Sequence, residues 1–241
     1  MTLSHLIPTL LFSTVFTATA LAHPVRSPAD DTLTPAFDIL DAHATTDGRL
    51  VTFMMELNGM AGSVKPEAVG QLTGSQVDAY VWPTSLDPAT VGFDAGSGRL
   101  ALAITAHPDF DDTPLFDENN DGDPANDGAD WHSHWVVLVP EDACGAGLKV
   151  RDVSPGQDLL PATAPGLPIA LDSPGMSPVL QGRTARITVP VSEAEHQSFD
   201  AVTARLEVHP DGAQPLLCVT GVYDIGSGDL SLPGVIMGET E

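Results

Sequence analysis

The sequence predicts an all-β fold, an antiparallel β-sandwich of the immunoglobulin-like or jelly-roll-like type, with few or no helices and one long acidic loop. The first observation is that apolar side chains recur with period two in many short runs, as in 51–57 (VTFMMEL) and 202–209 (VTARLEVH). Such alternation is typical of strands that bury one face. The second is that Gly, Pro, Asn and Asp interrupt these runs at short intervals, as expected for the turns of an all-β protein.

Strand candidates follow one another along most of the chain. The Asp47-Gly48 pair predicts a tight hairpin turn between the first two of them. A stretch rich in Pro, Gly and Ser, 154–182, separates the first six candidates from the last three. We therefore expect one sandwich domain over 35–241, with a subdivision into 35–153 and 183–241 around this stretch as the alternative. The candidates are 36–45, 49–58, 77–82, 99–106, 132–139, 148–153, 184–191, 200–208 and 216–224.

The first 22 residues have the composition of a secretory signal. They contain no Asp, Glu, Lys or Arg, run apolar from Leu6 to Phe16 and end in alternating alanines. This pattern predicts cleavage after Ala22, with cleavage after Ala20 as the alternative, although the usual basic residues near the start are missing. We expect an extracytoplasmic protein, periplasmic or secreted, whose mature chain begins with a flexible leader over 23–34.

Charge and cysteine content narrow the classes of partner. The chain has 33 acidic and 9 basic residues, for a formal net charge of −24. Nucleic acids and anionic membrane surfaces are therefore not expected partners, because both are bound through Lys and Arg, whereas metal cations are expected. The two cysteines, Cys144 and Cys218, predict one disulfide in an exported chain, with two free thiols or a metal-binding pair as alternatives.

The acidic residues concentrate in 107–135, which contains nine carboxylates and no Lys or Arg. Here Asp117, Asn119 and Asp121 stand at alternate positions and are followed by Gly122 and Asp123. This string resembles the start of the calcium loop of EF-hand and dockerin-type proteins, over about seven residues. The resemblance implies Ca²⁺ bound by the side chains of the three alternating residues and by the main-chain carbonyl of Asp123.

The second half of this loop departs from the EF-hand pattern. Pro124 stands where an apolar residue is usual, and Gly128 stands where a bidentate Glu is usual. We expect Asp127 or Asp130 to complete the calcium shell instead. The alternative is an acidic turn that holds no ion and is screened by water.

His132 and His134 stand two positions apart in the run WHSHW, which leads into an apolar strand candidate. Residues at i and i+2 on a strand point to the same face, so the two imidazoles can share one ion. The pair resembles the H-x-H strand of α-type carbonic anhydrases, a likeness limited to this run. A third ligand from His107, Asp109 or Asp111 would give a three-ligand site for Zn²⁺ or Cu²⁺. The alternative is a histidine pair that only makes hydrogen bonds.

These observations predict an exported, acidic metal-binding protein, with calcium in the 117–130 loop and a transition metal at the three histidines. One alternative is a metal-dependent extracytoplasmic hydrolase in which Asp109 or Asp111 is the general base. Another is a structural or adhesive surface module that calcium only rigidifies. The sequence contains no G-x-S-x-G, H-E-x-x-H or P-loop motif, so an enzyme is the less favoured expectation.

Overall fold

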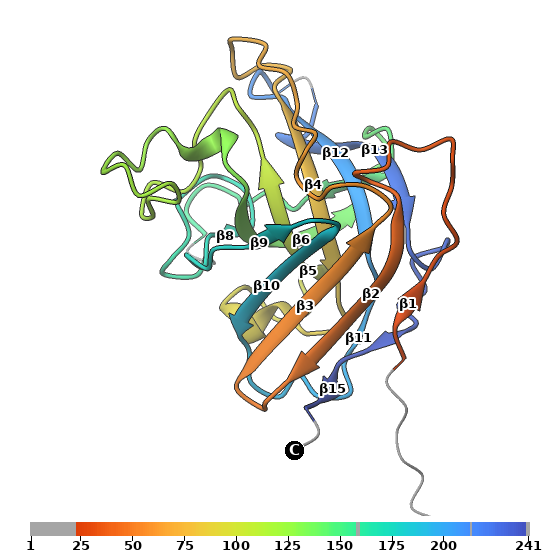
Figure 1. Ribbon diagram of the computed structural model, residues 1–241. Helices are drawn as coiled ribbons and strands as arrows, with labels where there is room; N and C mark the ends of the chain where they lie inside the picture. Colours follow the sequence, from red (N-terminus) through yellow and green to blue (C-terminus); the bar gives the residue numbers. More distant parts are fainter. Residues whose placement is uncertain (1–22, 158–159, 213, 240–241) are drawn as a thin grey trace, which may run out of the picture.

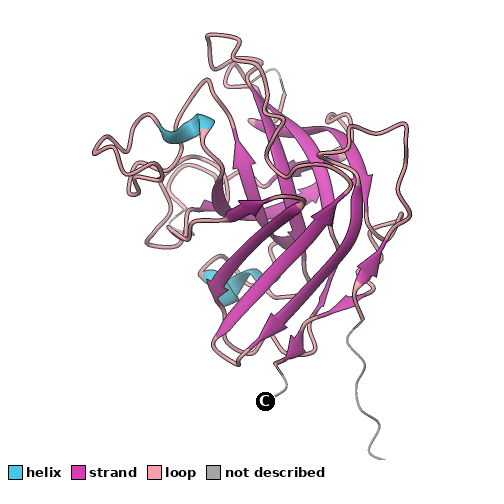
Figure 2. Ribbon diagram, viewed as in Figure 1, coloured by secondary structure: helices cyan, strands magenta, loops and turns pink. Residues whose placement is uncertain are grey.

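The computed structural model describes residues 23–157, 160–212 and 214–239, and its regular structure is almost entirely β-strand (Figures 1 and 2). Two short 3-10 turns, η1 (Pro88–Val91) and η2 (Asp127–Ala129), are the only helical elements in these ranges. No helix there is long and apolar enough to cross a membrane. The predicted signal, 1–22, lies outside the described residues. The all-β, antiparallel expectation is confirmed.

The first of two large sheets is antiparallel except at one edge, where a short strand from the C-terminal end runs parallel to its neighbour. Its central hairpin turns at Asp47, whose Oδ1 accepts hydrogen bonds from the backbone amides of Arg49 and Leu50. The strand order is β1 (Val25–Arg26), β2 (Ile39–Thr46), β3 (Leu50–Leu57), β10 (Thr184–Pro190) and β9 (Val179–Gln181), and β15 (Met237–Gly238) pairs with β2.

The second sheet closes on itself. Its strand order is β5 (Arg99–Ala106), β4 (Gln76–Pro83), β12 (Val202–Val208), β13 (Leu217–Ile225), β7 (Leu148–Val150), β6 (His132–Pro140) and β8 (Leu171–Asp172). Because β6 also pairs with β5, the first six of these strands form a closed ring, which we call the closed sheet. A separate pair is formed by β11 (Ser198–Phe199) and β14 (Gly234–Val235).

Alternate residues of β4, β5 and β6 face two different interiors. The large side chains of these strands point outward and pack against the first sheet, which lies in front of the closed sheet in Figure 1. The small side chains point into the closed sheet, where Ala and Val predominate. The outward set includes Tyr80, Trp82, Leu100, Leu102, Ile104, Trp135 and Val137. The inward set includes Val77, Ala79, Val81, Ala101, Ala103 and Val136.

Both large sheets contain strands from both halves of the chain, since β3 pairs with β10 and β4 pairs with β12. The Pro/Gly-rich stretch 154–182 contributes β8 to the second sheet and β9 to the first. Part of the predicted leader, 23–34, belongs to the fold: Val25 is 1% exposed and β1 pairs with β2. The physical reason is that Val25 is apolar and completes the main core beside the end of β13.

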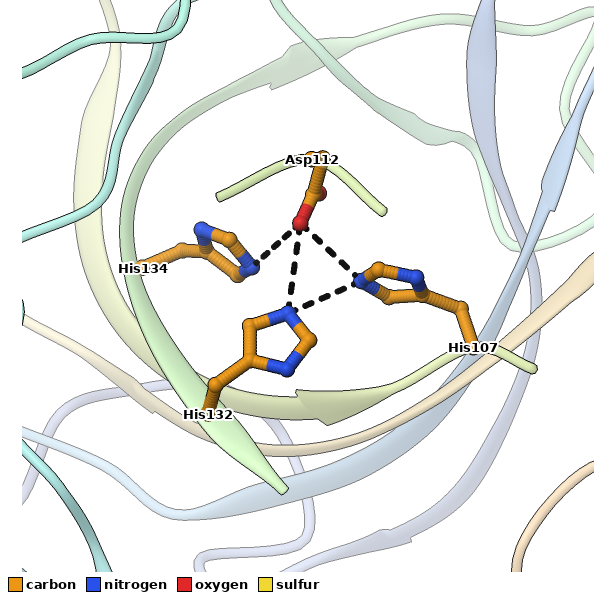
Figure 3. A group of neighbouring side chains, drawn as sticks. All are labelled: His107, Asp112, His132 and His134. Atoms are coloured by element: carbon orange, nitrogen blue, oxygen red, sulfur yellow. Dashed lines mark hydrogen bonds and ion pairs between the residues drawn. The ribbon is translucent and has the colours of Figure 1, made fainter. Parts of the chain in front are cut away.

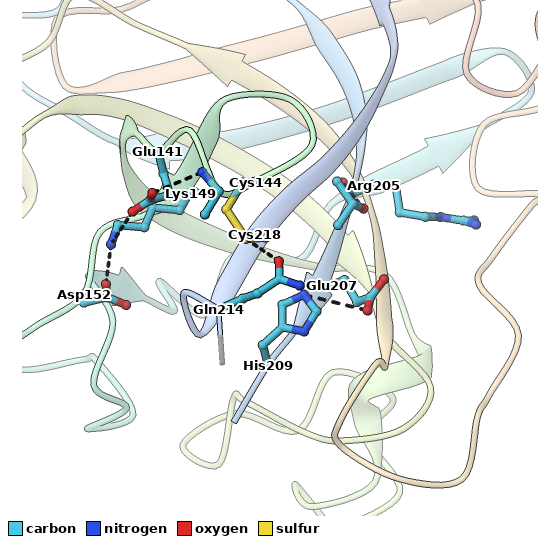
Figure 4. The surroundings of a disulfide bond; sticks show 11 residues. Glu141, Cys144, Lys149, Asp152, Arg205, Glu207, His209, Gln214 and Cys218 are labelled. Atoms are coloured by element: carbon cyan, nitrogen blue, oxygen red, sulfur yellow. Dashed lines mark hydrogen bonds and ion pairs between the residues drawn. A yellow bond between two sulfur atoms is a disulfide. The ribbon is translucent and has the colours of Figure 1, made fainter. Parts of the chain in front are cut away.

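The predicted disulfide between Cys144 and Cys218 is present, with a Cα–Cα distance of 5.2 Å (Figure 4). It fastens the turn between β6 and β7 to β13, where Cys218 is paired with Lys149. The ammonium group of Lys149 lies between the carboxylates of Glu141, at 3.3 Å, and Asp152, at 2.5 Å. The disulfide therefore fastens one wall of the closed sheet, where β7 pairs with β13.

Candidate metal centre

Strand pairing brings the three histidines to one end of the closed sheet. His132 and His134 lie on β6 and share the face that points into the closed sheet. In the antiparallel pairing of β5 with β6, His134 lies opposite Ala103 and His132 lies opposite Thr105. His107 follows β5 directly and continues the inward-facing series from Thr105. His107, which lies 25 residues before His132 in the chain, thereby supplies the third imidazole.

The three imidazoles converge on one carboxylate oxygen (Figure 3). The Nε2 atoms of His107, His132 and His134 lie 3.1, 3.2 and 3.3 Å from Oδ1 of Asp112. Nε2 of His107 lies 2.9 Å from Nε2 of His132. The four ligand atoms are all within 4.8 Å of one another, and no other His, Cys, Asp or Glu group in the described part of the chain converges in this way. The histidine side chains are 1–2% exposed and that of Asp112 is 9% exposed. We call these four residues the His₃Asp cluster.

The other nitrogen of each ring is fixed by a hydrogen-bond partner. Nδ1 of His107 donates to the carbonyl of Phe110 at 2.9 Å, and Nδ1 of His132 donates to the carbonyl of Asp130 at 2.7 Å. Because a carbonyl can only accept, these two Nδ1 atoms carry the ring proton, and the Nε2 atoms of the neutral rings present lone pairs to the centre. Nδ1 of His134 lies 3.2 Å from Oγ of Ser173. Such outer partners are typical of histidines that bind metals.

The electrostatics of the cluster favour a buried carboxylate anion. Burial alone would raise the pKa of Asp112, but its electrostatic and hydrogen-bonding contacts with the histidines outweigh burial and hold this pKa well below its usual range. Burial also opposes protonation of His132, yet Asp112 outweighs it and raises the pKa of His132. For His134 burial prevails and the pKa is lowered. A buried anion needs a compensating cation, which a metal ion or protons on the rings can supply.

The three separations from Oδ1 of Asp112 are compatible with a tetrahedral metal site. Bonds of 2.0–2.1 Å to the metal place neighbouring ligand atoms of a tetrahedron about 3.3 Å apart. The three separations from Asp112 Oδ1, 3.1–3.3 Å, agree with this edge length. In addition, Nε2 of His134 is buried and has no hydrogen-bond partner. The residues present therefore have the chemistry and the spacing to hold one metal ion.

Asp109 and Asp111, the two carboxylates considered as a further ligand or as a general base, serve the loop backbone instead. Asp109 accepts hydrogen bonds from the amides of Val69 and Gly70 at 3.0 and 2.6 Å. Asp111 accepts from the amides of Thr113 and Asp127. Neither carboxylate belongs to the converging group.

The carboxylate of the His₃Asp cluster is that of Asp112, whereas the sequence predicted Asp109 or Asp111 as a carboxylate ligand. Nothing in the sequence separates it from the other acids of the loop, because its inward direction depends on how 107–113 folds over the end of the closed sheet. Backbone contacts set the fold of that segment, and no local sequence pattern predicts them.

The carboxylates of the predicted calcium loop hydrogen-bond to the loop itself. Asp117 accepts from the amide of Gly122 at 2.9 Å, and Asp121 accepts from the amide of Asp123 at 2.8 Å. The side-chain amide of Asn119 donates to Asn126. The carboxylates of the loop do not form a converging group among the described residues. Calcium binding by this loop stays a prediction.

The residues expected to complete the calcium shell lie at the base of the loop. Asp127 is fully buried, and its Oδ2 accepts from the amide of Glu118 at 2.9 Å. The carboxylate of Asp130 lies 3.6 Å from the ammonium group of Lys65. Asp130 also contributes to the His₃Asp cluster, through the carbonyl that accepts from His132.

Gly128, which stands where an EF-hand loop has its bidentate Glu, is fixed by packing. Its carbonyl accepts a hydrogen bond from the amide of His107 at 2.6 Å. A Cβ atom at this position would lie 1.7 Å from the carbonyl oxygen of Phe110. The glycine thus allows the two ends of the acidic loop to meet behind His107.

No protein-family model, no curated protein and no solved structure matches this chain.

Proposed function

We propose that the protein binds one transition-metal ion at His107, Asp112, His132 and His134, and that this ion is Zn²⁺. The observation that carries the proposal is the 2.9 Å separation of two Nε2 atoms whose rings both donate from Nδ1 to carbonyls. Neutral rings in this arrangement would direct two lone pairs at each other. A shared cation removes that repulsion.

The arrangement favours Zn²⁺ over Cu²⁺. Cu²⁺ prefers a square or tetragonal arrangement, in which one ligand atom lies about 4 Å from the atom opposite it. All three ring nitrogens are instead 3.1–3.3 Å from the Asp112 oxygen, so none stands opposite it. Three imidazole nitrogens and a carboxylate oxygen are ligands that Zn²⁺ accepts in tetrahedral sites.

The ion would join the long acidic loop to the closed sheet. Asp112 is carried by the loop, whereas His132 and His134 are carried by β6. Four protein ligands without an open position are typical of structural zinc sites. The site therefore supports a metal-binding protein in which the ion fixes the loop over the end of the closed sheet.

We infer in addition that the mature protein works outside the cytoplasm. The disulfide between Cys144 and Cys218 supports this location, because such bonds persist in oxidising compartments. The signal-like composition of 1–22 supports it independently.

Zinc titration of the chelator-treated protein tests the proposed site. One Zn²⁺ per chain is expected to bind, and His132→Ala or Asp112→Ala should weaken binding by about 100-fold or more. His43→Ala is the matched control, because His43 lies on β2 outside the cluster and pairs with Asp41. If His132→Ala and His43→Ala bind Zn²⁺ as tightly as the unaltered chain, the proposal is wrong.

A further inference from the structure

The closed sheet encloses a cavity of about 730 Å³. Its walls are the inward faces of β4, β5, β6, β7, β12 and β13, and β8 and the adjoining loops contribute further lining. At one end it reaches the His₃Asp cluster, since His107, Asp112 and His134 are among the lining residues. The walls are aliphatic and include Val77, Ala79, Val81, Val136, Ala204 and Leu206.

The alternation of side-chain size explains why the space is open. The bulky residues of β4, β5 and β6 serve the core between the two sheets, and the inward positions carry mainly Ala and Val. Small inward side chains cannot fill the ring, although protein interiors are normally packed without large voids. The volume falls within the range of roughly 300–1,000 Å³ that small-molecule sites occupy. The cavity has the size and lining of a ligand site.

The opposite end of the cavity is bordered by two leucines in unusual backbone conformations. Leu230 and Leu232 have φ angles of 58° and 56° and both line the cavity. A left-handed conformation is costly for a leucine, and such residues persist where the surrounding structure requires them. Arg99 is the basic residue at this end, and its guanidinium donates to the carbonyl of Thr84.

We propose that this cavity binds an aliphatic carboxylate, with the head on the metal ion at the His₃Asp cluster and the chain along the apolar walls. The inference rests on the proposed zinc site. Zn²⁺ and the Asp112 carboxylate together carry one net positive charge, which attracts one anionic oxygen head. Nε2 of His134 is buried without a hydrogen-bond partner beside the cavity, so the metal it would hold faces the space.

The ligand can enter the coordination sphere without displacing a histidine. Each imidazole is anchored through Nδ1, whereas the contacts of the Asp112 side chain in the described structure are its ion pairs with the three histidines, the one with His132 being also a hydrogen bond. Asp112 is therefore the ligand that can give way, or Zn²⁺ can accept a fifth ligand.

Calorimetric titration with dodecanoate tests this inference on the zinc-loaded, full-length mature protein. We expect one dodecanoate per chain, and binding weaker by about tenfold or more for dodecan-1-ol or after removal of zinc, because a charged head on a metal is worth more than a hydroxyl. Ala204→Phe should occupy part of the cavity and weaken binding by about tenfold or more, with zinc content unchanged. Ala68→Phe, at an exposed position before β4, is the matched control. Ala79→Leu provides a milder filling variant if Ala204→Phe does not fold.

The outcomes separate this inference from the zinc site. Zinc bound at one per chain with no dodecanoate bound would overturn the ligand proposal and leave the metal site intact. Equal binding by the filled variants would show adsorption to the surface and would also overturn it. Equal affinity with and without zinc would place the head elsewhere, with Arg99 at the other end as the candidate, and would overturn the assigned orientation. Absence of zinc binding in the titration described above is the separate failure of the proposed function.

Discussion

His107 Nε2 lies 2.9 Å from His132 Nε2, although 25 positions separate the two residues in the chain. Each ring is fixed from behind, His107 by the carbonyl of Phe110 and His132 by that of Asp130. Neither ring can rotate its lone pair away without losing a buried hydrogen bond. The fold therefore holds two Nε2 atoms, each with a free lone pair, at a distance that a shared cation makes favourable.

Zinc is expected to stabilise the folded protein, because it binds the assembled cluster and not the unfolded chain. At a free concentration of 100 times Kd, the free energy of unfolding should rise by about 2.7 kcal/mol. Urea unfolding with and without zinc measures the difference. Asp112→Ala should lose this response, and an unfolding curve of the unaltered chain that ignores both zinc and chelator would contradict the prediction.

Zinc affinity is expected to fall as the pH drops below about 6.5, because a protonated imidazole cannot bind the ion. The affinity falls toward acidic pH because protons and zinc compete for the same Nε2 atoms. The raised pKa of His132, where the effect of Asp112 exceeds that of burial, strengthens the competition on the acidic side. Competition titrations with a chromophoric chelator across pH 5–8 measure the profile. An affinity that is constant over this range would exclude histidine ligands.

Ser173→Ala is expected to lower zinc affinity by about 10- to 100-fold, because the serine hydroxyl fixes the ring of His134 through Nδ1. Ser133→Ala is the matched control. Ser133 lies between the two histidines of β6, but its hydroxyl donates to the carbonyl of Met176 on the other face. Zinc titration of both variants should separate them. Equal losses of zinc affinity in the two variants would mean that any disturbance near β6 weakens zinc binding. Ser173 would then have no positioning role.

Gly128→Ala is expected to destabilise the fold by about 2 kcal/mol or more, because the added methyl group would overlap the carbonyl of Phe110. It should also weaken zinc binding, since the carbonyl of Gly128 accepts from the amide of His107. Gly221→Ala, where nothing lies within 4 Å of the added atom, should change stability by less than about 1 kcal/mol. Similar unfolding free energies for the two variants would contradict the packing argument.

Calcium is expected to raise the melting temperature through the 117–130 loop, if the resemblance to the EF-hand loop reflects a site. Asp117→Ala or Asp121→Ala should then abolish the shift, because these carboxylates stand at the first and fifth positions of the pattern. The scan should be done on zinc-loaded protein, with calcium added alone. A melting curve indifferent to calcium would leave the loop as an acidic turn closed by its own hydrogen bonds.

The long strands could be predicted from the sequence because each buries one face and so alternates with period two. The pattern in 51–57, for example, places Val51, Phe53, Met55 and Leu57 in the main core. Strands of two residues, such as β1, β8 and β14, could not be predicted, because two residues cannot display a period. The closed sheet was not predicted either, since closure depends on which distant strands pair.

The candidate site could be predicted in part for the same reason. His132 and His134 share a face because they are two apart on a strand, and that follows from the sequence. The approach of His107 depends on the register of β5 with β6, which the sequence does not reveal. Asp112 could not be chosen among nine acids of one segment, because only the fold of the loop directs it inward.

Anomalous diffraction from crystals of the zinc-loaded protein, with data collected on both sides of the zinc absorption edge, tests whether one zinc ion binds at the His₃Asp cluster. We expect one anomalous peak per chain, about 2.0–2.2 Å from Nε2 of His107, His132 and His134 and from a carboxylate oxygen of Asp112. A well-diffracting crystal with no peak among these four side chains, or with its strongest peak at other residues, would contradict it.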